Sequence, residues 1–401
     1  MTSTIPHGWD QPSHQLWLKG QRLEAVQKVI GQLNAFGADK PLQLVFQLAY
    51  YFFLINDYVA AATVLQNQLL RTPNHPELLT NLAVCCSRIN QHAEAVNYAN
   101  SAMAIQPSNT VALDVLANNH FRLGNETAAA AAGTQVLRLR DQQSAGVPQD
   151  WSLPALRPGE YARLPSKRNV IAFSLWGQGL QYLRGAIHNT LLSLTYFPQW
   201  QLRFYVDEEL APEMSDFLVS HGAELVVSAP KSTTRQKLCW RFQVANDPTV
   251  GYFLVRDADS VFGAREKAAV DAWLASDYWF HVIRDWWTHT DLILAGMWGG
   301  VAGVLPNLSG MVAEYDSGRV ETPNIDQWFL RDRVWPYIRQ SCLVHDRCFR
   351  LPGSLPIPAP TPAGMAHIGQ DEFAVRRLEQ EQFLRRHVKQ GSALSKLLAL
   401  A

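Results

Sequence analysis

The sequence of 401 residues lacks several features that would assign it to a common class of protein. It has only five cysteines, none spaced as Cys-x-x-Cys, which predicts neither a zinc ribbon nor a disulfide framework. Basic and acidic residues number 35 each, so the chain has no bulk charge of the kind that binds nucleic acid. No strand-like segment is followed by Gly-x-Gly-x-x-Gly or a Walker sequence, which argues against dinucleotide oxidoreductases and P-loop enzymes.

A membrane-spanning run and an export signal are also missing. The longest apolar run, 292–308, contains four glycines and a proline, so it predicts a buried strand, a turn and a helix. The first ten residues have neither the basic region nor the apolar stretch of a secretory signal. We therefore expect a cytoplasmic protein without a transmembrane segment, and its length predicts two domains.

The N-terminal third repeats itself every 34 residues. Leu-Ala pairs begin at 48, 82 and 116, and alanines recur at 61, 95 and 129. This period and these small residues resemble the tetratricopeptide repeat, in which they allow paired helices to approach closely. The predicted helices are 42–55, 58–71, 76–89, 92–106, 110–122 and 125–141, after a degenerate capping pair at 12–19 and 21–35. Such a solenoid binds a protein partner in its groove, or packs only against the rest of the chain or a second copy.

The remainder of the chain alternates between strand and helix patterns. The predicted strands are 170–175, 202–206, 224–227, 252–255, 278–285 and 343–346, and helices are predicted at 180–195, 211–221, 234–246 and 264–275. This alternation indicates a doubly wound α/β fold with right-handed crossovers. The predicted organisation is a multi-domain chain: a tetratricopeptide helical domain at 1–145, a proline-rich linker at 146–168, an α/β domain at 169–370 and a C-terminal helix at 371–401. The basic face of that helix indicates either a solvated face of a packed helix or a membrane-surface helix.

The most informative motif is Arg256-Asp257-Ala258-Asp259, which follows the apolar strand 252–255. Open α/β sheets bind ligands at the carboxyl ends of their strands, so both carboxylates are expected in the site. Two carboxylates one residue apart suit a hard divalent cation such as Mg²⁺ or Mn²⁺, which bridges them to substrate phosphates. A solvated turn is the alternative for a motif this short.

These motifs resemble the GT-A fold of nucleotide-sugar glycosyltransferases. Asp326-Gln327 and His345 are similar to the Asp-Gln pair and the metal-ligand histidine of the glycogenin-like, retaining branch. The run 255–299 also resembles a bacterial glycosyltransferase-like family, in which Asp-x-Asp-Ser is followed by Arg-Glu, Ala-Val, Trp, His-x-x-Arg-Asp and Gly-Met-Trp-Gly. The chain departs from that family at Trp286-Trp287, where His-Pro is usual, and at Arg347, where serine is usual.

The resemblance implies a role for each candidate residue. Asp257, Asp259 and His345 would hold the divalent metal, with His367 as the alternative to His345. Asp326 and Gln327 would be the catalytic pair beneath the sugar, in a retaining or an inverting reaction. The implied donor-binding residues are Ser174 and Gly177 near the base, Arg256 and Arg284 at the phosphates, Gly296 and Gly299 at the sugar, and Asp285 and His289. For Arg284 and Asp285, a local ion pair is an equally open alternative, and for His289 a purely structural role is equally open.

The predicted activity is therefore metal-dependent transfer of a sugar from a nucleotide-sugar, expected to be a UDP-sugar, to a protein or glycan acceptor. The repeats would recruit or orient that acceptor or another partner, and a homo-oligomer is compatible with them. Two alternatives remain: a catalytically inactive scaffold for protein–protein interaction, and another metal-dependent phosphoryl or nucleotidyl transferase.

Overall fold

The computed structural model describes residues 5–144, 146, 150–229, 232–318, 322, 324–349 and 351–400. Residue 145 and part of the predicted linker, 147–149, lie outside these described residues. Contacts within the chain define two compact units. The repeat unit comprises Met1–Gln143 with Asp316–Glu321, and the α/β unit comprises Ser144–Tyr315 with Thr322–Ala401.

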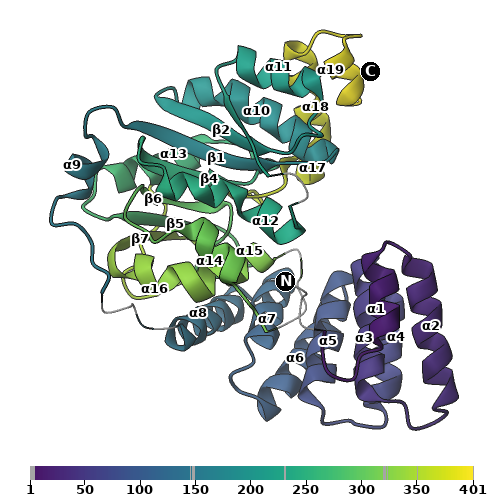
Figure 1. The fold of residues 1–401 in the computed structure, drawn as a ribbon. Helices are drawn as coiled ribbons and strands as arrows, with labels where there is room; N and C mark the ends of the chain where they lie inside the picture. Colours follow the sequence, from purple (N-terminus) through teal and green to yellow (C-terminus); the bar gives the residue numbers. More distant parts are fainter. Residues whose placement is uncertain are drawn as a thin grey trace. The chain divides into compact units, whose positions relative to one another are not determined.

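The repeat unit consists of antiparallel helix pairs that recur at the predicted period (Figure 1). Its helices are α1 (Gln11–Leu18), α2 (Arg22–Ala35), α3 (Leu42–Leu54), α4 (Tyr58–Leu69), α5 (Pro76–Arg88), α6 (His92–Ile105), α7 (Thr110–Arg122) and α8 (Glu126–Gln143). The repeating alanines Ala61, Ala95 and Ala129 are fully buried, as close packing of the paired helices requires. The tetratricopeptide-type architecture predicted from the sequence is thus present.

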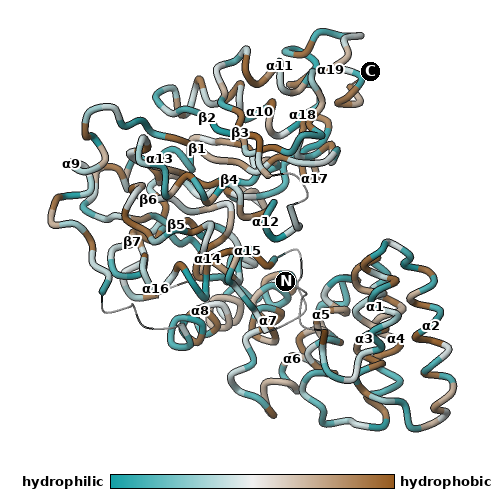
Figure 2. The backbone as a smooth tube through the Cα atoms, viewed as in Figure 1, coloured by the Kyte–Doolittle hydropathy of each residue, from teal (hydrophilic) through white to brown (hydrophobic). Residues whose placement is uncertain are grey.

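The α/β unit is built on one mixed sheet of seven strands in the order β3-β2-β1-β4-β6-β5-β7. The strands are β1 (Arg168–Leu175), β2 (Trp200–Val206), β3 (Glu224–Val227), β4 (Val250–Arg256), β5 (Phe280–Arg284), β6 (Met297–Val301) and β7 (Cys342–Asp346). Strand β6 is antiparallel to its neighbours β4 and β5, and the other pairs are parallel. Hydrophobic residues, brown in Figure 2, occur along the central strands, and β4 is buried along its whole length.

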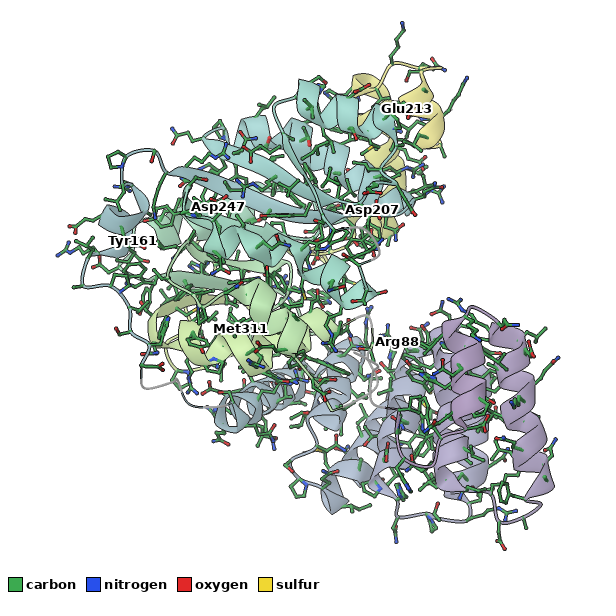
Figure 3. The ribbon with its side chains drawn as sticks, in the orientation of Figure 1. Arg88, Tyr161, Asp207, Glu213, Asp247 and Met311 are labelled. Atoms are coloured by element: carbon green, nitrogen blue, oxygen red, sulfur yellow. The ribbon has the colours of Figure 1, made fainter. Side chains whose placement is uncertain are left out.

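Two aspartates labelled in Figure 3 mark the opposite ends of the central strands. Asp207 follows the carboxyl end of β2, and Asp247 precedes the amino end of β4. After β1 the chain moves outward to β2 and β3 and then returns to β4 on the other side of β1. The carboxyl ends of β1 and β4 therefore flank a topological switch point, which is where open α/β sheets form their ligand crevice.

Helices cover both faces of this sheet. They are α9 (Pro158–Ala162), α10 (Leu180–Tyr196), α11 (Pro212–Ser220), α12 (Thr234–Cys239), α13 (Ala264–Leu274), α14 (Leu308–Glu314), α15 (Ile325–Phe329) and α16 (Trp335–Ile338), with the 3-10 helices η1 (Trp240–Asn246) and η3 (Arg339–Ser341) and the π-helix η2 (Leu330–Val334). Helix α10 contacts β1 and β2, whereas η1 contacts β1, β2 and β4. The connection from β1 to β2, which contains α10, and the connection from β3 to β4, which contains η1, run in opposite directions across the sheet. Because both crossovers are right-handed, α10 and η1 lie on opposite faces.

The C-terminal segment forms three short helices instead of one. They are α17 (Glu372–Val375), α18 (Arg377–His387) and α19 (Ala393–Leu397). The segment is packed on α10, because the buried guanidinium of Arg184 donates to the carbonyl oxygens of Leu398 (2.9 Å) and Ala399 (3.1 Å). Among the described residues, no helix combines the length and the apolar character needed to cross a membrane.

Candidate functional site

The candidate site lies in the loop that leaves β4 at the switch point. Asp257 follows the last residue of the strand, and its side chain is 44% exposed. The start of β6 lies beside it, since Met297 pairs with Arg256. A Cβ atom on Gly296 would lie 2.0 Å from Oδ2 of Asp257, so only glycine leaves room for this carboxylate.

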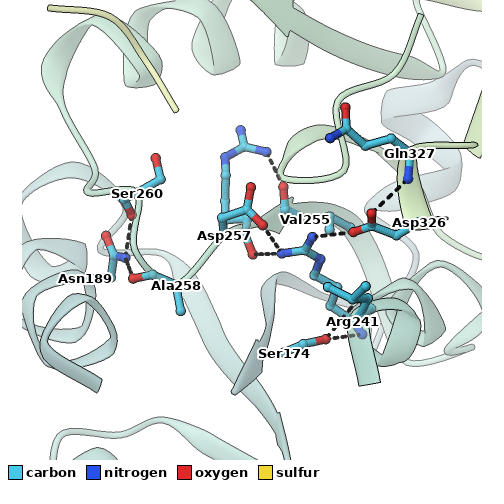
Figure 4. A network of polar contacts seen from close by, with 11 residues as sticks. Ser174, Asn189, Arg241, Val255, Asp257, Ala258, Ser260, Asp326 and Gln327 are labelled. Carbon is cyan, nitrogen blue, oxygen red and sulfur yellow. Dashed lines mark hydrogen bonds and ion pairs between the residues drawn. The ribbon is translucent and has the colours of Figure 1, made fainter. Parts of the chain in front are cut away.

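Arg241, which the sequence analysis did not select, joins the first aspartate of the loop to the predicted catalytic aspartate (Figure 4). Its Nη1 forms an ion pair with Asp257, and its Nη2 lies 3.2 Å from Oδ2 of Asp326 on α15. The Arg241 backbone N–H donates to the hydroxyl of Ser174 at 3.1 Å. Ser174, at the end of β1, thus helps to hold the turn of η1 that presents this arginine.

A buried asparagine on α10 holds the other side of the acidic loop. The side-chain amide of Asn189 donates to the carbonyl oxygens of Ser260 (2.7 Å) and Ala258 (3.4 Å). Its carbonyl oxygen accepts from the backbone N–H of Phe262 at 3.0 Å. Asn189 therefore supplies hydrogen-bond partners to backbone groups on both sides of Asp259 after the loop leaves the sheet.

Replacement of Asn189 by alanine is expected to destabilise the protein by about 2–4 kcal/mol, because buried backbone groups of the loop lose their partners. Urea unfolding would measure the loss. The control is Gln382→Ala on α18, an exposed amide of the same unit, which should change the free energy of unfolding by less than about 0.5 kcal/mol. Equal effects of the two changes would show that Asn189 has no special role in holding the loop.

The carboxylates of the site have raised pKa values. Burial, together with the charges of Asp257 and Asp371, raises the pKa of Asp259 to about 7. Burial also raises the pKa of Asp326 to about 6, although Arg241 opposes the shift. Carboxylates that are crowded in this way favour binding of a proton or a metal cation.

Asp259→Asn is therefore expected to stabilise the protein at alkaline pH. Between the unfolded pKa of about 4 and the folded pKa of about 7, the folded state retains a proton that the unfolded state has lost, so stability falls as the pH rises. The variant's advantage should grow from pH 4 to pH 7 and reach roughly 1–3 kcal/mol at pH 8. Urea unfolding at pH 5 and pH 8 measures it, with the exposed Asp271→Asn as control. An advantage that does not change with pH would contradict the shift.

Two arginines predicted to contact phosphate are placed elsewhere by the structure. Arg256 is buried, forms an ion pair with Glu266 of α13 and donates to the carbonyl oxygen of Trp298 at 3.0 Å. Successive side chains of a strand point to opposite faces, so Arg256 cannot accompany Asp257 into the site. Arg284 is likewise buried, pairing with Asp346 at 2.9 Å. Both arginines therefore stabilise the sheet.

His345 is also separated from the two aspartates. Strands β6 and β5 lie between β4 and β7, which corresponds to about 14 Å at the usual strand spacing. The Nδ1 atom of His345 instead lies 2.8 Å from Nε2 of the buried His281. No group of three metal-ligating side chains forms in the part of the chain that the structure describes, so the predicted triad is not assembled.

The alternative histidine belongs to a segment that does reach the acidic loop. The ring of His367 stacks on Trp286 at 4.5 Å, and Asp285 accepts the backbone N–H of Ile368 at 2.8 Å. Five residues after His367, the backbone N–H of Glu372 donates to the carbonyl oxygen of Asp259 at 3.4 Å. The segment 367–372 thus covers the end of the sheet beside the site.

The other predicted residues fall into two groups. Gln327 follows Asp326 and donates its backbone N–H to that carboxylate at 2.9 Å, while Gly177 lies in the loop after β1 with a positive φ of 68°. The remaining residues are structural in this arrangement. Gly299 lies inside β6 opposite Leu254, and His289 is a buried ring whose Nδ1 accepts the backbone N–H of Asp285 at 2.9 Å.

Comparison with known proteins adds little. No family model matches the chain, and no curated protein matches it. Among solved structures, the MamA protein has a TM-score of 0.31 at 15% identity, over 33% of this chain and 70% of that one. A Thermobaculum terrenum O-GlcNAc transferase mutant has a TM-score of 0.37 at 15% identity, over 56% of this chain and 41% of that one. PcrH in complex with the chaperone binding region of PopD has a TM-score of 0.25 at 14% identity, over 25% of this chain and 77% of that one. Similarities at these scores carry no functional argument.

Proposed function

We propose that the chain is a metal-dependent glycosyltransferase that transfers a sugar from a nucleotide-sugar, expected to be a UDP-sugar, to a protein or glycan acceptor. The observation that carries the proposal is that Arg241 pairs with Asp257 and Asp326 at the switch point of the sheet, with Asp259 in the same loop and near enough to interact electrostatically with Asp257 and Arg241. This is the position in which an open α/β sheet binds a nucleotide.

The residues present fit a hard divalent cation. Mg²⁺ and Mn²⁺ bind through one or two carboxylates and complete their coordination with substrate phosphates and water. Asp257 is partly exposed, and the pKa of Asp259 is raised by burial and by the charges of Asp257 and Asp371, which a cation would offset. Asp257 and Asp259 would hold the cation, which would stabilise the departing diphosphate. A third protein ligand is not required for this chemistry.

The remaining residues of the site position the reactants. Arg241 forms ion pairs with both Asp257 and Asp326, which holds the two carboxylates in place and limits the repulsion between them. A pKa of about 6 suits Asp326 for accepting a proton from an acceptor hydroxyl near neutral pH, as an inverting reaction requires. In a retaining reaction, Asp326 and Gln327 would support the positively charged sugar centre.

The proposal is tested by incubating the protein with Mn²⁺ and a panel of nucleotide sugars. We expect at least one donor to be hydrolysed slowly, with release of its nucleoside diphosphate, and we expect chelation to stop the reaction. Release of pyrophosphate or phosphate would instead identify a nucleotidyl or phosphoryl transferase. No turnover and no stabilisation by Mn²⁺ with UDP would favour a protein-binding scaffold, for which helical repeats are well suited.

A further inference from the structure

The junction between α17 and α18 exposes apolar side chains beside the candidate site. All six residues from 374 to 379 are exposed. Val375 is 57% exposed, and Leu378, at 75%, is the most exposed large apolar side chain described in the α/β unit. The junction lies close to the acidic loop, because the backbone N–H of the nearby Glu372 forms a hydrogen bond with the carbonyl oxygen of Asp259. These exposed apolar side chains are available for burial against a partner.

Basic side chains surround this junction. The segment 374–389 contains five basic and two acidic residues, a formal charge of +3 in a chain whose net charge is zero. All five basic side chains are exposed: Arg376, Arg377, Arg385, Arg386 and Lys389. Two of them have acidic partners: Arg376 lies 3.9 Å from Glu372, and Arg377 pairs at 3.0 Å with Glu381, which also pairs with the buried Arg184. The exposed side of the segment is therefore predominantly positive.

The geometry of α18 keeps Leu378, Arg385 and Arg386 on its outer side. Gln380 and Leu384 are buried and are followed by the buried Val388, so this line of residues faces the protein. The ring of Phe383 stacks on His188 of α10 at 4.0 Å. Leu378 and Arg385 lie seven residues apart and thus on one common face, away from the buried line. The helix is anchored to the unit and presents a fixed surface.

We propose that the segment 374–389 docks reversibly on an anionic lipid bilayer. Exposed basic residues are attracted to anionic headgroups, and Val375 and Leu378 can enter the boundary between headgroups and acyl chains. A soluble polyanion would satisfy the charges but not the exposed leucine. Docking would bring the acidic loop close to the membrane surface, and it does not depend on the proposed chemistry.

Co-sedimentation of the full chain with lipid vesicles tests the proposal. The protein should pellet with vesicles of phosphatidylcholine mixed with phosphatidylglycerol, stay in the supernatant with phosphatidylcholine alone, and be released by high salt. The variant Leu378→Gln/Arg386→Gln/Lys389→Gln should bind at least about tenfold more weakly, because each basic residue near an anionic surface adds to the affinity.

The control removes one exposed leucine and the same number of positive charges from exposed positions elsewhere: Lys19→Gln/Lys40→Gln/Leu194→Gln. It should bind like the unchanged protein, and all variants should keep the same donor turnover in solution. The proposal is overturned if the unchanged protein ignores anionic vesicles, or if the triple variant and the control bind equally. It is also overturned if Leu378→Gln alone has no effect, since the surface would then fit a soluble polyanion.

Discussion

Asp257→Asn and Asp259→Asn are each expected to lower metal-dependent turnover of the donor by about 1000-fold or more. The amide keeps the shape of the side chain but removes the charge that holds the cation. A bound metal contributes several kcal/mol to the stabilisation of a leaving group, and about 4 kcal/mol corresponds to a factor of about 1000 in rate. Initial rates of nucleoside diphosphate release at saturating Mn²⁺ measure the effect.

Asp271→Asn is the matched control, because this aspartate lies on α13 of the same unit with 53% of its side chain exposed. It should keep full activity. Thermal unfolding separates lost binding from lost folding: without metal, Asp259→Asn should unfold no earlier than the unchanged protein. Mn²⁺ with UDP should stabilise the unchanged protein but neither variant of the acidic loop. Normal turnover in either variant would remove the two carboxylates from the mechanism.

The helical repeats could be predicted from the sequence almost residue by residue. Their contacts are short in range, and the small residues that allow close packing recur at one period. Six of the seven strands were also predicted within a few residues, because buried strands are short apolar runs ending in polar loops. The prediction for 292–308 was wrong in its order, because its first residues form a loop, the strand β6 begins only at Met297, and the helix α14 begins only at Leu308. The same reasoning placed Asp257 and Asp259 at the carboxyl end of a central strand, and the structure has them there.

The neighbours of these aspartates could not be predicted in the same way. Arg256 was assigned to the site because it adjoins Asp257 in sequence, yet alternation along the strand directs it toward Glu266. His345 was assigned by resemblance, but the distance between β4 and β7 follows from the strand order, which no local pattern contains. Arg241 was missed because it reaches Asp257 and Asp326 only after the crossover to the opposite face of the sheet.

Arg241→Gln is expected to destabilise the protein by about 3–5 kcal/mol at pH 8. Removal of one partner from a buried ion pair leaves an uncompensated charge, here mainly that of Asp326, whose side chain is only 5% exposed. Without the arginine, the pKa of Asp326 should rise further above about 6, and the folded state would then hold its proton over a wider range. The loss should therefore be smaller at pH 5 than at pH 8, as urea unfolding at the two values would show.

A second substitution decides whether Arg241 stabilises the protein through its charge or through its packing. Asp326→Asn in the Arg241→Gln background should recover part of the stability at pH 8, giving a coupling energy of about 1–3 kcal/mol in a double-mutant cycle. Arg377→Gln is the control, because its side chain is 71% exposed and its pair with Glu381 should contribute less than about 1 kcal/mol. If Asp326→Asn instead deepens the loss, Arg241 stabilises the fold by packing, and the link between the acidic loop and α15 is not electrostatic.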